Sequence, residues 1–264
     1  MVSSVRQAFR SEMTESVWAA YRRRAEKLND GAANPLLAKY IELVSIQDEL
    51  SSLLIETCEV PIVTSDLALL SYFDDVALRA LLVKAMRGVA KGGPPVHEAE
   101  SLESLENLWH QVDEFEYPAD LPARLVLEVF ATEVSAWPHR EIETRPDRCP
   151  HCGFPVMCSM LREAGLGRSR YGCCSLCGSE WPEPRLGCLR CGEQHSAKLP
   201  LFTFEELPHI RIEACDSCGG WLKSIDLTRD AEALPMPDDV WSSVANIWAF
   251  EQGYQNIGNN LFRL

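Results

Sequence analysis

Four Cys-x-x-Cys pairs lie between residues 149 and 218, and they limit what this part of the chain can fold into. Two residues between cysteines let a tight turn present both sulfurs to one ion, with backbone amides directed at the thiolates. A glycine, which tolerates positive φ, follows each pair at positions 153, 178, 192 and 219. The pattern therefore predicts metal ligation by Cys149, Cys152, Cys174, Cys177, Cys188, Cys191, Cys215 and Cys218.

An internal repeat indicates which pairs share an ion. The first and third pairs lie 39 residues apart, and the second and fourth lie 41 apart. Trp181 and Trp221 follow the second pair of each unit by four and three residues. Each unit then has the spacing of a four-thiolate ribbon. We expect one site from Cys149, Cys152, Cys174 and Cys177 and a second from Cys188, Cys191, Cys215 and Cys218, with the interleaved grouping as the alternative.

The ligand type restricts the chemistry of both sites. Tetrahedral sulfur ligation suits zinc or a single iron, and the spacing does not separate the two metals. A site closed by four cysteines has no open position, so hydrolysis at the metal is not expected. The nearby histidines, His151, His195 and His209, are expected not to be ligands. Cys58, Cys158 and Cys173 fall outside the pairs, and we expect Cys58 to be a small buried helix residue.

Charge and hydropathy restrict the partners and the location. Asp and Glu number 39 against 25 Lys and Arg, which gives a formal net charge of -14. Such a chain repels a phosphate backbone, so no nucleic-acid partner is expected. No apolar run reaches the roughly 18 residues of a membrane helix, so no membrane insertion is expected. Because no apolar stretch follows Arg6 and Arg10, we expect a cytoplasmic protein with reduced cysteines.

The first half of the chain has the periodicity of helices. Asn34 and Pro35 form a start signal, and apolar residues then follow on one face until Pro61. That face consists of Leu36, Tyr40, Leu43, Leu50 and Leu54. A further helix is expected over 67–86, and Gly88 is expected to help end that helix. Helices are also expected over 101–112 and 123–137, which makes about five helices before the metal region. The run Arg22 to Arg24 is interpreted as a solvated helix face.

The second half is rich in Gly, Cys and Pro, with short β-prone pieces such as 210–212. Beyond it, Asp238 or Asp239 is expected to cap a final helix that Gly253 ends. The predicted fold class is α+β, with an all-helical N-terminal region, two tandem four-cysteine modules and a C-terminal helix. The expected domains are 1–147 (helical), 148–186 and 187–226 (metal modules), and 227–264 (C-terminal helix and tail).

Longer motifs surround these features: RAEKL at 24–28, NPL at 34–36, CPHCG at 149–153, CSLC at 174–177 and RIEACDSC at 211–218. With them, the chain resembles the formate dehydrogenase accessory proteins of the FdhE type. The resemblance implies rubredoxin-like modules that hold two mononuclear ions, iron rather than zinc, through the eight paired cysteines. It also implies a cytoplasmic protein that matures respiratory formate dehydrogenase and contacts the catalytic subunit of that enzyme.

The leading functional hypothesis is therefore a non-catalytic assembly factor, because no catalytic triad, phosphate loop or paired-carboxylate motif stands out. The runner-up is a rubredoxin-like electron carrier that uses mononuclear iron held by four thiolates. A zinc-ribbon nucleic-acid binder has the wrong charge. A thiol oxidoreductase would need its Cys-x-x-Cys at a helix start in a βαβ pattern, which the sequence lacks.

Overall fold

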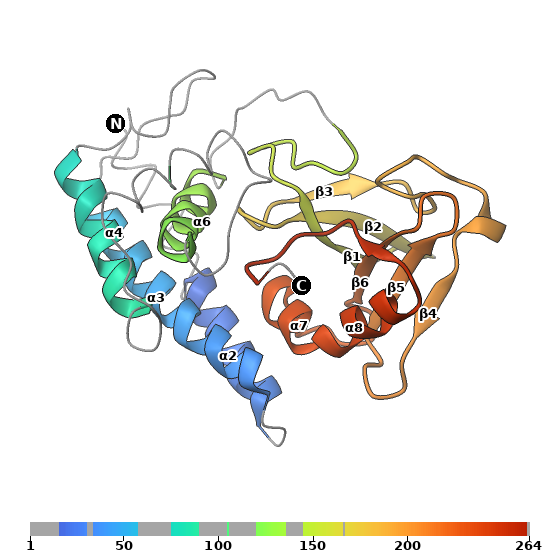
Figure 1. The fold of residues 1–264 in the computed structure, drawn as a ribbon, viewed down its shortest axis with the longest axis horizontal. Helices are drawn as coiled ribbons and strands as arrows, with labels where there is room; N and C mark the ends of the chain where they lie inside the picture. The colour runs from blue at the N-terminus through green and yellow to red at the C-terminus, as the bar shows by residue number, and fades with distance from the viewer. Residues whose placement is uncertain are drawn as a thin grey trace.

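The structure is a computed structural model of the 264-residue chain and describes residues 16–30, 34–57, 75–89, 105, 120–135, 145–165 and 167–262. Helices form the N-terminal region, as predicted, and lie to one side of a sheet (Figure 1). They are α2 (Val17–Asn29), α3 (Pro35–Thr57), α4 (Asp75–Val89) and α6 (Leu121–Ser135). In the part of the chain that the structure describes, no helix is both long and apolar enough to cross a membrane.

Helix α3 begins where the sequence predicts. The side-chain oxygen of Asn34 accepts hydrogen bonds from the backbone N–H groups of Leu36 and Leu37, at 3.1 and 3.2 Å. Pro35 takes the first helical position, where its missing N–H costs nothing. The expected core face is buried at Tyr40, Leu43, Leu50 and Leu54, and Leu36 is partly buried against the same core. The predicted stop at Pro61 and the cysteine at position 58 lie outside the described residues.

The other expected helices are present with different limits. Helix α4 covers the second part of the expected segment 67–86 and continues through Gly88, which was expected to help end it. A Cβ atom on Gly88 would lie 2.6 Å from the side chain of Ile46, so the glycine lets α3 and α4 pack closely. Helix α6 begins two residues before the expected segment 123–137. Of segment 101–112 only Leu105 is described, and it is helical and buried.

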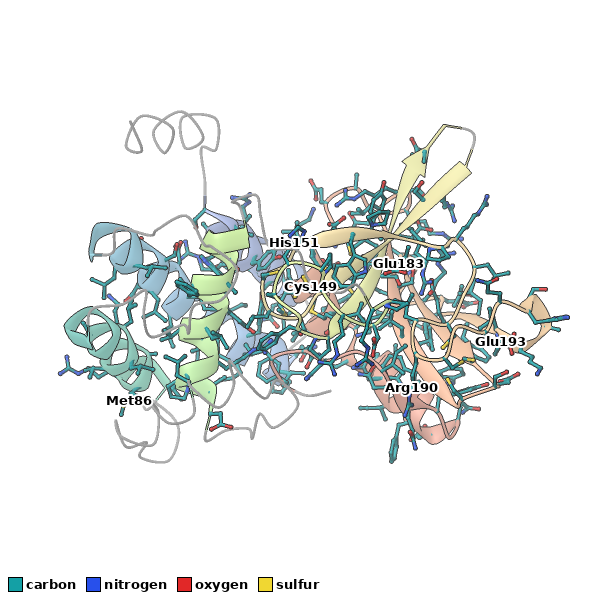
Figure 2. All side chains as sticks on the ribbon, turned by 90° about the horizontal axis from the view of Figure 1, so that it is seen from above. Met86, Cys149, His151, Glu183, Arg190 and Glu193 are labelled. Atoms are coloured by element: carbon teal, nitrogen blue, oxygen red, sulfur yellow. The ribbon has the colours of Figure 1, made fainter. Side chains whose placement is uncertain are left out.

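The two cysteine-bearing units are joined in a single sheet. Its strands are β1 (Val156–Ala164), β2 (Gly167–Cys174), β3 (Glu180–Glu183), β4 (Leu201–Thr203), β5 (Ile210–Cys215), β6 (Gly220–Asp226) and β7 (Gln255–Asn256). Their order is β3-β2-β1-β6-β5-β4, with β7 paired to β6. Neighbouring strands within each unit are antiparallel, whereas β1 and β6 pair in parallel and connect the units. In Figure 2, Cys149 lies beside the helical region, and Arg190 and Glu193 of the second unit lie away from it.

The C-terminal region contains two short helices instead of one. They are α7 (Pro235–Trp241) and α8 (Ser243–Glu251), with Ser242 between them. The predicted capping role of Asp238 and Asp239 is wrong, because both residues are buried inside α7. Helix α7 contacts α2 and α3 on one side and β1 and β6 on the other. It therefore joins the helical region to the sheet.

Buried ion pairs hold this junction together. Arg24 on α2 donates from Nε and Nη2 to Asp238, at 2.9 and 2.6 Å, and from Nη2 to Asp230 at 2.6 Å. Only 5% of the Arg24 side chain is exposed, so the expectation of a solvated arginine face is wrong at this position. Burial alone would lower the pKa of Arg24, but hydrogen bonding to Asp238 reverses this and raises the pKa above its ordinary value. Arg24 is therefore a fixed charge in the interface.

Candidate metal centres

Each unit presents its cysteines from two turns in equivalent places. In the first unit, the turn Cys149–Cys152 precedes β1 and the turn Cys174–Cys177 connects β2 to β3. In the second unit, the turn at 188–191 precedes β4 and the turn at 215–218 connects β5 to β6. The repeated tryptophans are equivalent too, because each lies on the strand after the second turn and pairs back across the hairpin.

The glycines after the turns have the predicted backbone conformation. Their φ angles are 79° at Gly153, 67° at Gly178, 75° at Gly192 and 67° at Gly219. The first unit shows how this geometry serves the sulfurs. The N–H of His151 donates to Cys149 Sγ at 3.4 Å, and the N–H of Leu176 donates to Cys174 Sγ at 3.3 Å. Such backbone dipoles stabilise negative charge on sulfur.

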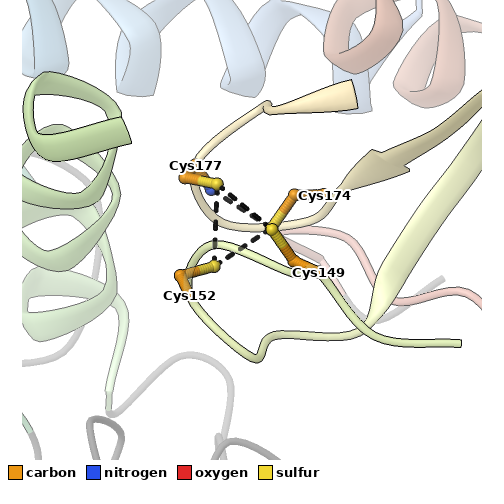
Figure 3. Close-up of side chains that lie close together, drawn as sticks. All are labelled: Cys149, Cys152, Cys174 and Cys177. Carbon is orange, nitrogen blue, oxygen red and sulfur yellow. Dashed lines mark hydrogen bonds between the residues drawn. The ribbon is translucent and has the colours of Figure 1, made fainter. Parts of the chain in front are cut away.

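The sulfur atoms gather in the two expected groups, Cys149, Cys152, Cys174 and Cys177, and Cys188, Cys191, Cys215 and Cys218. The interleaved alternative is therefore wrong as a description of the fold. Figure 3 shows the first group. The Sγ atoms of Cys149 and Cys177 lie 3.7 Å apart, and those of Cys152 and Cys174 lie 3.3 Å apart. In the second group, Cys188 and Cys218 lie 3.7 Å apart.

These distances fit a four-sulfur metal ion. A tetrahedral ion with metal–sulfur bonds of about 2.3 Å would hold its sulfurs about 3.8 Å apart. The pairs at 3.7 Å need almost no rearrangement to reach that separation, and the donor chemistry suits zinc or iron. Both groups can therefore hold one ion each, with all four positions filled by protein.

The pKa values of cysteines in the first group are shifted in opposite directions. Hydrogen bonds from Cys149, and then from Cys152 and Cys174, lower the pKa of Cys177 well below its ordinary value. Burial raises the pKa of Cys174, and the hydrogen bond with Cys149 raises that of Cys152. Because thiols must lose protons to become ligands, metal binding at this site will weaken as the pH falls.

The helical region supports the first site directly. Arg124 on α6 donates from Nη2 to the carbonyl oxygen of Ser175, inside the second cysteine turn, at 2.5 Å. Its Nε donates to Glu128 at 2.8 Å, and Gln47 of α3 donates to the same carboxylate. Burial raises the pKa of Glu128, and the charge of Arg124 opposes that shift. Sequence reasoning missed this set, although two opposite charges four residues apart in the otherwise apolar stretch 121–131 were a usable signal.

The two groups differ in exposure. In the first group, Cys149 and Cys174 are fully buried, Cys177 is 3% exposed and Cys152 is partly exposed. In the second, Cys191 is solvent-exposed and Cys218 is partly exposed. The second site is therefore the more accessible to chelators and to redox partners.

From protein loaded with zinc at both sites, we expect a chromogenic chelator to remove the two ions in two phases of equal amplitude. The fast phase belongs to the second site and should be on the order of tenfold faster, since the buried site must open locally first. Absorbance of the chelator complex gives both rates. Cys215→Ser with Cys218→Ser should abolish the fast phase only, and Cys174→Ser with Cys177→Ser the slow phase only. A single phase in the wild type, or the opposite assignment, would contradict the exposure argument.

His151, His195 and His209 are not members of either group of sulfurs. His209 approaches Asp230 and Asp238 closely enough to suggest a third metal-binding cluster. Arg24 donates to both carboxylates, however, and His209 Nε2 lies 2.8 Å from Asp238. That cluster is an ion-pair network that already contains its cation. Of the unpaired cysteines, Cys158 and Cys173 are buried on facing positions of β1 and β2, apart from either site.

The fold and the site together define a class of protein: a helical region joined to a sheet that carries two groups of four cysteine sulfurs, each able to hold one metal ion. Comparison with known proteins narrows the class. Residues 148–185 match the FdhE central domain and residues 186–263 match the FdhE C-terminal domain. The cysteine-bearing part of this chain therefore belongs to the FdhE family, as the resemblance predicted.

Curated relatives and a solved structure agree with this assignment. An FdhE homolog of Pseudomonas aeruginosa is 36% identical over 156 residues, which cover 53% of this chain and 50% of the relative. One of Aquifex aeolicus is 33% identical over 113 residues, covering 42% and 40%. The chain thus matches half or less of the length of these relatives. The crystal structure of FdhE from Pseudomonas aeruginosa has the same fold, with a TM-score of 0.66, 23% identity, and 94% and 97% coverage.

Proposed function

We propose that this protein is a non-catalytic maturation factor for respiratory formate dehydrogenase. The observation that carries the proposal is that two closed four-sulfur groups sit in domains of the FdhE family. With four sulfurs at each centre, no position is left for a substrate. The first centre is also fixed to the helical region through Arg124. This construction supports a role for the sites in holding a docking surface together.

We further propose that all eight paired cysteines are ligands and that each chain holds two mononuclear ions. The sulfur separations support one ion in each group. The family resemblance favours iron, with zinc as the alternative. In this proposal, residues 1–147 form the helical domain, 148–186 and 187–226 form the metal modules, and 227–264 form the C-terminal part.

The proposed partner is the catalytic subunit of formate dehydrogenase, met in the cytoplasm. The formal charge of -14 supports a protein partner over nucleic acid. The runner-up function, electron transfer, is favoured by one observation, the exposed Cys191 in the second site. An exposed sulfur shortens the path for an electron to a redox partner, and exposure also tunes the potential of an iron centre.

A wholly zinc-loaded protein separates the two functions. Zinc preserves tetrahedral sulfur ligation but cannot change its oxidation state. We expect zinc-loaded protein to bind the catalytic subunit and to restore formate dehydrogenase activity in cells that lack their own copy of this protein. Binding is measured by surface plasmon resonance under anaerobic conditions. Retained binding of the catalytic subunit without restored activity would show instead that electron transfer is the task.

A further inference from the structure

Helix α8 presents an apolar stripe to solvent. Among the described residues, five large hydrophobic side chains are strongly exposed, and three of them lie on this nine-residue helix. Val244 and Ile247 are each 59% exposed and Phe250 is 77% exposed. Their spacing of three residues puts them on one side of the helix. The other side buries Ala245, Asn246 and Ala249 against the domain.

An aromatic row extends this stripe onto the sheet. The ring of Trp248 on α8 lies 4.7 Å from that of Phe202 and 5.4 Å from that of Phe204. Phe202 in turn lies 6.2 Å from Tyr254. These rings are partly exposed and hold α8 against β4, which Figure 1 shows at the same end of the molecule. We call the three exposed residues of α8 and this aromatic row the α8 face.

The surroundings of the α8 face are acidic. The face is built from segments 200–208 and 241–256, which contain Glu205, Glu206 and Glu251 and no Lys, Arg or His. All three glutamates are exposed. Asp216 adds a fourth carboxylate, which accepts a hydrogen bond from the Tyr254 hydroxyl. Three cations lie at the ends of these segments. Arg190 donates to Gln255 at the far end of the second, and Arg229 donates to the carbonyl oxygen of Pro208 at the end of the first. Lys198 precedes the first segment by two residues and pairs with Glu193.

A second copy of this chain is a poor occupant for such a surface. In a two-fold dimer the acidic rim of one copy would face the rim of the other, with -14 on each chain. The exposed stripe also consists of only three side chains, whereas a standard interface takes roughly 20–30 residues from each partner. The charge complementarity instead favours a short partner segment with apolar and basic side chains.

We propose that the α8 face binds a basic, apolar segment of the client protein. Apolar side chains of that segment would cover Val244, Ile247 and Phe250, and its lysines and arginines would meet the three glutamates. The aromatic faces beside them add favourable contacts for a cation. This inference rests on the proposed function, because it names the surface by which the protein holds its client.

The test uses the full-length, metal-loaded protein, the catalytic subunit, and an array of overlapping short peptides that covers that subunit. We expect Ile247→Ser with Phe250→Ser to weaken binding about tenfold or more, since exposed apolar anchors dominate such contacts. Charge reversal at Glu205, Glu206 and Glu251 to lysine should weaken it similarly and reduce its salt dependence. Leu186→Ser, at an apolar residue 48% exposed on the first metal unit, is the matched control and should leave binding unchanged.

Metal content and thermal unfolding are measured on every variant, so that a folding defect is recognised. Peptides that bind the wild type but do not bind the Ile247→Ser, Phe250→Ser variant should be rich in Lys, Arg and apolar residues. Full binding of the subunit by both α8 variants would overturn this surface while leaving the proposed function intact. Preference for acidic peptides, or a wild-type dimer that the serine variant dissolves, would also overturn it. If the wild type does not bind the subunit at all, the proposed function fails, and α8-dependent binding of basic peptides would still uphold the docking surface.

Discussion

Replacing Cys174 and Cys177 with serine should reduce the metal content from two ions to one and unfold the first metal unit. The two ligands lie in the turn between β2 and β3 and make up half of the first group of sulfurs. Metal ligation in such a unit supplies on the order of 10 kcal/mol of folding free energy. The turn also carries Ser175, whose carbonyl accepts from Arg124, so the helical region should lose part of its attachment. Metal analysis and near-ultraviolet circular dichroism measure these losses.

The helical region should keep most of its helicity in this variant, because its helices also pack on one another, α2 on α3, and α3 and α4 on α6. Far-ultraviolet circular dichroism tests this. Cys158→Ala is the control, since it removes a buried sulfur that lies outside both groups and near Met160 Sδ at 3.9 Å. It should leave two ions bound. A double-serine variant that retained two ions, or a Cys158 variant that lost one, would refute the ligand assignment.

The sequence was sufficient to predict the metal groups because their information is local. Four turns of identical spacing, each followed by glycine, leave the backbone few conformations, and the repeat length selected the pairing that the fold adopts. The parallel contact between β1 and β6 was not predictable in this way. It joins residues such as Ser159 and Ser224, which are far apart in the chain and carry no pattern that marks them as neighbours.

The errors concern residues whose role is set by tertiary contacts. Asp238 and Asp239 have the local character of caps, yet each is buried because a distant cation neutralises it. Asp238 meets Arg24, and Asp239 meets the buried Lys223 at 2.9 Å. Helix propensity and capping rules depend only on residues that are close in the sequence, so they predict such carboxylates to lie at the surface. The same reason explains why one arginine of the run 22–24 is buried.

Replacing Arg24 with alanine should lower the free energy of unfolding by about 3–5 kcal/mol, the cost of leaving a buried charge without its partner. Asp238 is fully buried and would keep only His209 and the N–H of Leu234, each at 2.8 Å. Asp230 would lose the cation that holds its pKa below the ordinary value against the opposing effect of burial. Urea unfolding of metal-loaded protein at neutral pH measures the loss.

The matched control is Arg22→Ala, on the same helix, where a side chain 41% exposed pairs with Glu26 at 4.0 Å. Such a surface pair contributes about 0–1 kcal/mol.

The pH dependence of the free energy of unfolding supplies a second test. A carboxylate with a lowered pKa stabilises the fold above its unfolded pKa, about 3.9, and that stabilisation is lost as the pH falls through the folded value. The difference in the free energy of unfolding between wild type and Arg24→Ala should therefore shrink below about pH 4. Protonation of Asp230 removes its ion pair with Arg24, and only the wild type has that ion pair to lose. Equal stability of the two arginine variants at neutral pH would mean that the helical region and the sheet are held together without this ion-pair network.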